Sequence, residues 1–160
     1  MEITYGASTA QGNRKENQDV LVIAKDHLGP GVHVFGVLDG HGDNGKQAAE
    51  LTRHELLASL KKSASQIVPA SLDSWNEDQL RRAITDVFRT VDEAVMSNEK
   101  VDTYISGTTA AVVVVFEKWR RVVVANIGDS RVIYGKPGAT TAALTTYVYS
   151  NYVFIIDVIG

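Results

Sequence analysis

The spacing of apolar residues along the chain predicts two strands at its beginning. Residues 19–25 (DVLVIAK) and 32–38 (VHVFGVL) are short runs rich in β-branched side chains, and a Gly-Pro-Gly turn separates them. This pattern is typical of two successive strands. Residues 39–45 are polar and rich in glycine, so we expect a loop there that is neither helix nor strand. From residue 46 onward the apolar spacing becomes helical.

The clearest helical pattern lies in the middle of the chain. Ser74 and Glu77 have the spacing of a capping box, and the apolar residues that follow recur at intervals of three and four. They are Leu80, Ile84, Val87, Phe88, Val91 and Val95. This spacing predicts an amphipathic helix whose apolar stripe packs on a sheet. Residues 63–71, which precede it, are expected to form a linker within one domain.

After Gly107 the pattern predicts only strands, at 108–116, 121–127 and 131–134, joined by short turns. The run 110–115 is apolar on both faces, so we place it inside a sandwich. The resulting order is two strands, two helices and three strands, without the regular alternation of a parallel sheet. We therefore predict an α+β fold, a layered β-sandwich flanked by helices.

The composition and charge of the chain bear on its compartment and on the kinds of partner it can bind. The chain has 160 residues, a formal net charge of −3 and no cysteine, so we expect no disulfides and a cytoplasmic or nuclear protein. No stripe of basic and aromatic residues suggests a nucleic-acid partner. No apolar run approaches the ~20 residues that span a bilayer, so we expect no membrane partner. Nothing in the sequence indicates an oligomeric state.

The residues best suited to chemistry lie at the ends of the first two predicted strands. Asp19 opens the first strand and Asp39 follows the second. If the strands pair, both carboxylates meet at one end of the sheet, where oxygen ligands suit Mg²⁺ or Mn²⁺ and a two-metal site. Arg14 lies in the preceding loop, where it could hold a phosphate, and His41 could protonate a leaving group. Taken singly, each of these residues has an ordinary explanation as part of a turn or as a solvated side chain.

Four segments together carry a more specific signal. They are Arg14-Lys15-Glu16-Asn17-Gln18-Asp19, Val37-Leu38-Asp39-Gly40-His41-Gly42, Ser106-Gly107-Thr108-Thr109-Ala110 and Asn126-Ile127-Gly128-Asp129-Ser130-Arg131. In this order they resemble the Arg…Asp motif, the Asp-Gly-His-Gly signature, the Ser-Gly-x-Thr-Ala strand start and the Gly-Asp-Ser-Arg hairpin of the PP2C (PPM-type) metal-dependent protein serine/threonine phosphatases. The resemblance covers about residues 5–134. It identifies the chain as the N-terminal part of that catalytic domain.

The resemblance implies a hydrolase that removes phosphate from phosphoserine and phosphothreonine of a phosphoprotein substrate, with two Mn²⁺ or Mg²⁺ ions that activate hydroxide. By this resemblance, Asp39 would bridge the two ions and Asp19 would bind one of them. The carbonyl of Gly40 would complete part of the metal shell, and Asp129 matches the residue of a third, weaker metal site. Arg14 would bind the phosphoryl oxygens, and His41 would protonate the serine or threonine alkoxide.

The chain departs from the family pattern after about residue 134. Two metal-binding aspartates that the family carries in late Asp-Gly and Asp-Asn motifs have no counterpart, and Asp157 lies in the different context Ile-Asp-Val. We therefore interpret residues 1–144 as a partial phosphatase domain, C-terminally incomplete, and residues 145–160 as a divergent apolar tail. Because the number of carboxylates largely sets metal affinity, we expect the activity of this chain to be weak or lost.

Two alternative functions remain open. A non-catalytic, phosphatase-like fragment would keep Arg14 and the early aspartates and would bind a phosphoprotein without hydrolysing it. The spacing Gly40-x-Gly42-x-x-Gly45, after a strand and before a helix, also matches the dinucleotide-binding fingerprint. That nucleotide-binding interpretation is the weaker one, because Asp39 would place a carboxylate beside the pyrophosphate.

Overall fold

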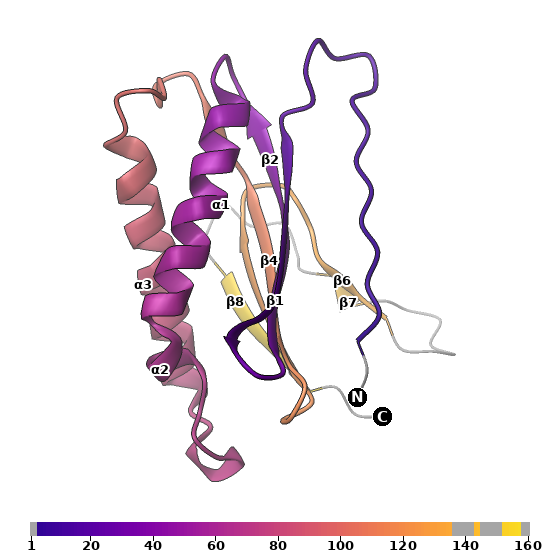
Figure 1. Ribbon diagram of the computed structural model, residues 1–160, viewed down its shortest axis with the longest axis vertical. Helices are drawn as coiled ribbons and strands as arrows, with labels where there is room; N and C mark the ends of the chain where they lie inside the picture. The colour runs from indigo at the N-terminus through magenta and orange to yellow at the C-terminus, as the bar shows by residue number, and fades with distance from the viewer. Residues whose placement is uncertain (1–2, 136–142, 145–151, 158–160) are drawn as a thin grey trace.

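The computed structural model describes residues 3–135, 143–144 and 152–157 and packs a layer of helices against an antiparallel sheet (Figure 1). In chain order the elements are β1 (Asp19–Gly29), β2 (Val32–His41), α1 (Gly45–Lys62), α2 (Ala64–Ile67), η1 (Leu72–Ser74), α3 (Glu77–Met96), β3 (Gly107–Thr108), β4 (Ala110–Phe116), β5 (Arg121–Ile127), β6 (Ile133–Tyr134), β7 (Ala143–Leu144) and β8 (Tyr152–Asp157). The main sheet has the order β1-β2-β4-β5-β8, and β3 pairs with β2. The predicted α+β class is confirmed.

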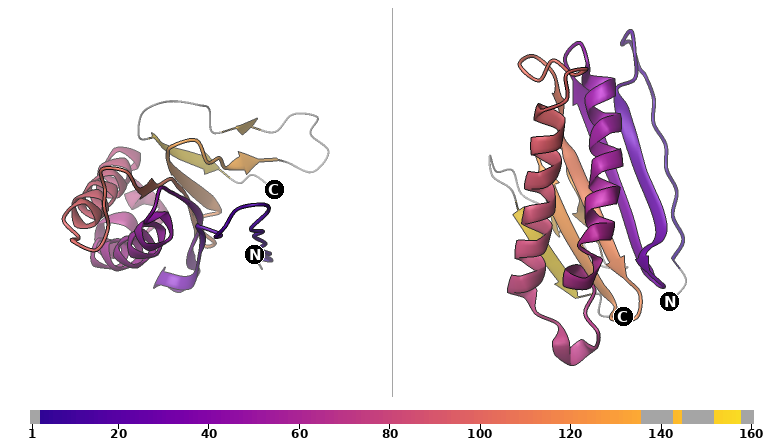
Figure 2. Two further views of the ribbon diagram at one scale, coloured as in Figure 1. Left: turned by 90° about the horizontal axis from the view of Figure 1, so that it is seen from above. Right: turned by 60° about the vertical axis from the view of Figure 1, so that its left-hand side comes forward.

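The described elements form layers on both faces of the main sheet. Helices α1 and α3 cover one face, whereas the N-terminal segment and the two-stranded β6–β7 sheet lie on the other (Figure 2). The ring of Tyr5, in the N-terminal segment, lies 5.3 Å from the ring of Phe35 in β2. The core lies between the sheet and the helices, where Val34, Leu38 and Phe116 are fully buried.

The apolar stripe predicted for the second long helix is buried in α3. The buried side chains are Leu80, Ala83, Ile84, Val87, Phe88, Val91 and Val95. Burying a large aliphatic or aromatic side chain stabilises a fold by about 1.5–3 kcal/mol, so this face anchors the helix to the sheet. The predicted start of the helix was wrong. Asn76 is the N-cap, and its side chain accepts a hydrogen bond from the backbone of Gln79 at 2.9 Å, whereas Ser74 ends the short helix η1.

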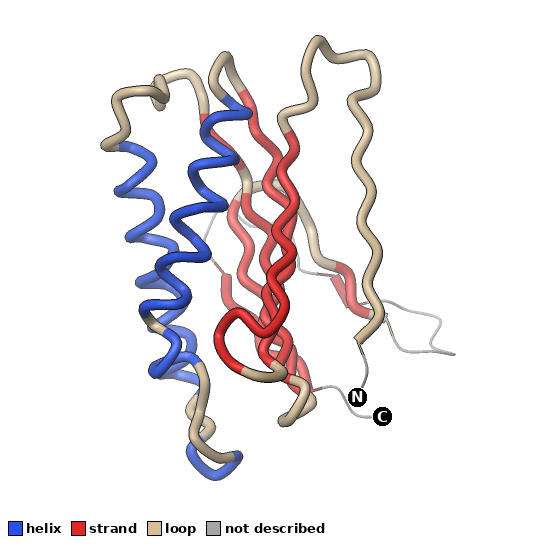
Figure 3. The backbone as a smooth tube through the Cα atoms, viewed as in Figure 1, coloured by secondary structure: helices blue, strands red, loops and turns tan. Residues whose placement is uncertain are grey.

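Two further local predictions need correction. The stretch from Asp39 was predicted to be a loop, but β2 continues to His41 because Gly40 and His41 pair with the two residues of β3. Residues 64–67 of the predicted linker form the short helix α2, which follows directly after α1 and is one of the helices coloured blue in Figure 3. Both errors have one cause: pairing and packing with distant segments override weak local preference.

The predicted apolar tail lies mostly outside the described residues. Its segment Tyr152–Asp157 forms β8, which pairs antiparallel with β5 and extends the main sheet. Among the helices that the structure describes, none combines the length and the apolar character that a membrane crossing requires.

Candidate active site

Two carboxylates meet at one end of the main sheet. In the antiparallel pair of β1 and β2, Asp19 lies directly opposite Asp39, so both side chains project from the same face of the sheet. Partial burial raises the pKa of Asp39 above its ordinary value of 3.8, and the negative charges of Asp19 and Asp129 raise it further. A hydrogen bond between the Asp19 and Asp39 side chains acts in the same direction. The structure thus brings together the two aspartates that the strand pattern placed at one sheet end.

Glycines allow the chain to turn tightly beside these carboxylates. A Cβ on Gly40 would lie 2.8 Å from the carbonyl oxygen of Gln18 and nearer still to the backbone of Gly45, so a larger residue does not fit between these segments. Gly42 has a φ of 83° and packs against the backbone of residues 105–106. The Asp-Gly-His-Gly sequence therefore forms a compact strand end directly before α1.

Asp19 is held in place by neighbours that the sequence analysis did not identify. The hydroxyl of Thr9 donates a hydrogen bond to the Asp19 carboxylate at 3.2 Å, and the Asn17 side chain donates to the Thr9 hydroxyl at 2.8 Å. The side-chain oxygen Oδ1 of Asn17 accepts a hydrogen bond from the backbone N–H of Asp19 at 3.0 Å. The Lys46 ammonium donates to the Asp19 carbonyl at 3.0 Å. Asn17 belongs to the Arg14–Asp19 motif, but no pattern in the sequence marks Thr9 as its hydrogen-bond partner.

The loop after β2 is fastened to two other segments. The Gln18 side chain donates to the carbonyl of Gly42 at 2.9 Å. The buried hydroxyl of Ser106 accepts from the backbone of Asn44 at 2.9 Å, and the Asn44 side chain accepts from the backbone of Asp102 at 3.2 Å. Ser106 belongs to the Ser-Gly-x-Thr-Ala segment, so the motif was recognised although its contact was not. These bonds fix the position of the Asp39–Gly45 segment relative to the rest of the fold.

Arg14 and His41 differ in how closely they approach the aspartates. Arg14 is exposed in a turn whose backbone bonds to Gln11, and within the described residues its side chain makes no polar contact with Asp19 or Asp39. His41 is also exposed, but its ring packs beside Gly107 and lines a cavity of about 290 Å³ between the sheet and the helices. Its charge lowers the pKa of Asp39, opposing the larger effects that raise it. His41 therefore lies near the aspartates, whereas Arg14 does not contact them in this arrangement.

The described donors suit a hard cation. Asp129 follows β5 in an exposed turn, near enough for its charge to act on Asp39. The mutual repulsion of Asp19, Asp39 and Asp129 would be relieved by a bound divalent cation, for which carboxylate and carbonyl oxygens are the preferred ligands. However, the described part of the chain contains no cluster of three or more His, Asp or Glu side chains close enough to hold a metal ion. The arrangement therefore fits a cation shared by Asp19 and Asp39, with the Gly40 carbonyl nearby.

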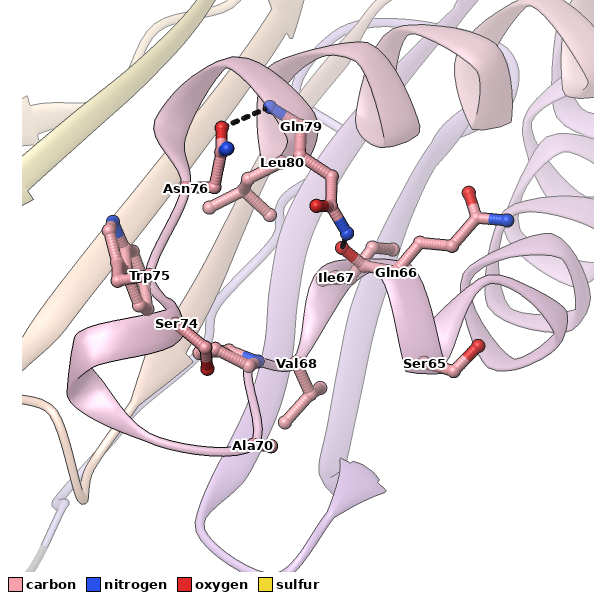
Figure 4. A pocket seen from close by; sticks show the side chains of 11 residues that line it. Ser65, Gln66, Ile67, Val68, Ala70, Ser74, Trp75, Asn76, Gln79 and Leu80 are labelled. Carbon is pink, nitrogen blue, oxygen red and sulfur yellow. Dashed lines mark hydrogen bonds between the residues drawn. The ribbon is translucent and has the colours of Figure 1, made fainter.

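A separate cavity of about 220 Å³ lies between α2 and the start of α3 (Figure 4). The side chain of Gln79 donates to the carbonyl of Gln66 at 3.4 Å beside this cavity. None of its lining residues carries an ionisable side chain. The cavity adjoins α2, which follows the C-terminal end of α1, whereas Asp39 lies in β2 shortly before the N-terminal end of α1. We therefore assign it no part in chemistry at the carboxylate site.

Known proteins match both the sequence and the fold. Residues 3–147 match the family described as Protein phosphatase 2C. Probable protein phosphatase 2C 11 of Arabidopsis thaliana is 32% identical over 140 residues, covering 87% of this chain and 34% of that protein. Probable protein phosphatase 2C 35 of the same plant is 35% identical over 120 residues, covering 74% of this chain and 31% of that protein. The chain thus spans about a third of the length of these relatives.

A solved structure extends the comparison to the fold. The serine-threonine phosphatase 2C of Toxoplasma gondii superposes on this chain with a TM-score of 0.65 at 24% identity, covering 85% of this chain and 46% of the other. The family match over residues 3–147 includes all four motifs. The chain belongs to the protein phosphatase 2C family.

Proposed function

We propose that this chain is part of a metal-dependent protein serine/threonine phosphatase and that Asp19 and Asp39 bind its catalytic Mn²⁺ or Mg²⁺ ions. The observation that carries the proposal is the pairing of Asp19 with Asp39 at one sheet end in a chain of the protein phosphatase 2C family. When bound, two such ions supply positive charge and a hydroxide nucleophile at neutral pH. The substrate class is a protein that carries phosphoserine or phosphothreonine.

We assign the roles of the other site residues from their positions relative to Asp19 and Asp39. The Gly40 carbonyl lies next to Asp39 and contributes an oxygen ligand, and Asp129 serves an accessory ion across the site. His41, two residues beyond Asp39, donates a proton to the alkoxide as its bond to phosphorus breaks. Arg14 lies in the exposed loop that precedes Asp19, and its guanidinium binds phosphoryl oxygens of the substrate. The cysteine-free composition supports a reducing compartment such as the cytoplasm or nucleus.

A second candidate function is phosphoprotein binding without hydrolysis. It is favoured by the finding that the described residues contain no cluster of three or more potential metal ligands. The nucleotide-binding interpretation has less support, because the fingerprint requires a parallel βαβ unit. The strands that flank α1 and α3 in the described sheet, β2 and β4, are antiparallel neighbours.

Hydrolysis of a phosphothreonine peptide by the 160-residue chain, measured across a Mn²⁺ titration, tests the proposal. We expect phosphate release that rises with Mn²⁺ and saturates only at high concentration, because few carboxylates bind the ions. Asp39→Asn removes a metal ligand and abolishes the metal-dependent rate. Asp43→Asn is the matched control, since it removes one negative charge from an exposed position four residues away and leaves the rate intact.

The outcomes separate the two candidate functions. Metal-dependent turnover that Asp39→Asn abolishes and Asp43→Asn retains supports the phosphatase. Peptide binding without turnover at any Mn²⁺ concentration favours the non-catalytic fragment. Turnover that survives Asp39→Asn contradicts the proposed metal site.

A further inference from the structure

One hydroxyl group bridges two segments that are far apart in sequence. The Thr109 hydroxyl oxygen accepts a hydrogen bond from the backbone N–H of Asp39 at 3.1 Å and lies 2.5 Å from the hydroxyl oxygen of Ser130. The backbone N–H of Thr109 donates to the carbonyl of Asp39 at 2.9 Å. Thr109 therefore bonds both the backbone N–H and the backbone carbonyl of Asp39, and it also contacts Ser130 in the turn that carries Asp129.

The methyl group of Thr109 packs against the same turn. Gly128 has a φ of 86°, and a Cβ at this position would lie 2.9 Å from Cγ2 of Thr109. The side chain of Thr109 is thus wedged between the Asp39 backbone and residues 128–130. Each substituent of this β-branched side chain has its own contact, so the orientation of the hydroxyl is fixed by packing as well as by hydrogen bonding.

The hydrogen bond between the two hydroxyl groups can run in either direction. Because the Thr109 oxygen accepts from Asp39, its own proton is free to donate to Ser130; the Ser130 hydroxyl can equally donate to the second lone pair of Thr109. In either case the Thr109–Ser130 bond joins the end of β2 to the turn after β5.

We infer that Thr109 and Ser130 are positioning residues whose hydrogen bond couples the Asp39 strand end to the Asp129 turn, so that metal affinity at Asp39 depends on Ser130. This inference rests on the proposed metal site. Groups that orient metal ligands typically alter metal affinity by about 10- to 100-fold when they are replaced. Neither hydroxyl is itself proposed to touch the metal or the substrate.

Isosteric substitutions separate this role from simple packing. Thr109→Val keeps the shape and the methyl contact but removes both hydrogen bonds of the hydroxyl, whereas Ser130→Ala removes only the bond to Thr109. Thr108→Val is the matched control, because the neighbouring Thr108 hydroxyl donates to the carbonyl of Thr109 at 3.0 Å and lines the cavity toward the helices. It removes a hydroxyl from the adjacent residue without touching Asp39.

Two measurements on the 160-residue chain test the coupling. In calorimetric Mn²⁺ titrations we expect Thr109→Val to weaken binding about 10-fold or more and Ser130→Ala to weaken it less. The double variant should bind about as Thr109→Val does, since both substitutions break one shared bond, and Thr108→Val should bind as the unaltered chain. In the metal-free protein, amide hydrogen exchange at Asp39 should accelerate in Thr109→Val and, to a lesser degree, in Ser130→Ala.

Each result bears on the inference in a defined way. Unchanged Mn²⁺ affinity in Thr109→Val, or equal weakening by Thr108→Val, overturns it while leaving the proposed metal site intact. If the losses of Mn²⁺ affinity in Thr109→Val and Ser130→Ala multiply in the double variant, the two residues act independently, and the proposed coupling through their shared bond is overturned. If the unaltered chain binds Mn²⁺ no better than Asp39→Asn, the proposed metal site fails, and the inference about metal affinity fails with it. Unaltered Asp39 exchange in both variants contradicts the hydrogen-bonded link itself.

Discussion

Replacing Gly40 by alanine probes the close packing on which the carboxylate site depends. A Cβ at this position would lie 2.6 Å from the carbonyl carbon of Gly45 and 2.8 Å from the carbonyl oxygen of Gln18. Both are backbone atoms, so no side chain can rotate away from the new methyl group. The start of α1 and the start of β1 must therefore move apart before the ordinary contact distance of at least 3.4 Å is reached.

The size of the effect follows from this geometry. Overpacking costs about 1–3 kcal/mol, and we expect Gly40→Ala to lower the free energy of unfolding by about 3 kcal/mol because the clash is with backbone on two sides. For a domain of this size each kcal/mol corresponds to about 2–4 °C, so Tm should fall by roughly 6–12 °C. A loss of this size is large against the 5–15 kcal/mol that stabilises a typical domain.

Urea unfolding followed by circular dichroism measures this difference directly. Gly6→Ala is the control, because a Cβ at position 6 would meet no atom within 4 Å. The control should unfold at the same urea concentration as the unaltered chain. If Gly40→Ala unfolded there as well, the packing of β2 against α1 and β1 would be looser than described, and the reasoning would be refuted.

Two further predictions concern charges at the site. Asp39→Asn should stabilise the metal-free chain at pH 7. Burial and the charges of Asp19 and Asp129 raise the pKa of Asp39, so the folded state disfavours the ionised carboxylate. The unaltered chain therefore loses stability as the pH rises through this raised pKa, whereas the asparagine variant does not. The gain in the free energy of unfolding should be at most about 1 kcal/mol, since the carboxyl group is partly solvated. Thermal unfolding at several pH values should show that this gain vanishes below the ordinary carboxyl pKa of 3.8. A Tm of the variant below that of the unaltered chain at pH 7 would contradict the prediction. Arg14→Ala should weaken phosphopeptide binding about 10-fold through loss of charged hydrogen bonds, with Tm unchanged because the side chain is exposed; Lys15→Ala is the control, and equal effects of the two substitutions would show that only the loop's charge matters.

Local sequence patterns were sufficient to predict most of the helices and strands and to identify the family. The β-branched runs became β1 and β2, and the three-and-four spacing became the buried face of α3. These predictions succeeded because the side-chain period of a strand or helix is a property of neighbouring residues. The four motifs identified the family for the same reason, since each is a short contiguous segment. Placing Asp19 opposite Asp39 required one further assumption, the pairing of two strands joined by a tight turn.

Only the tertiary structure decided how the site is supported. The partner of the Asp39 backbone is Thr109, 70 residues away, and the hydroxyl bonded to Asp19 belongs to Thr9. The extension of β2 through His41 likewise depends on its pairing with Gly107. None of these contacts leaves a periodic signal, because strand register and loop packing bring the partners together only after the chain has folded. The sequence therefore determines which residues can act as ligands, whereas their orientation follows from long-range hydrogen bonds and from glycines that permit close backbone approach.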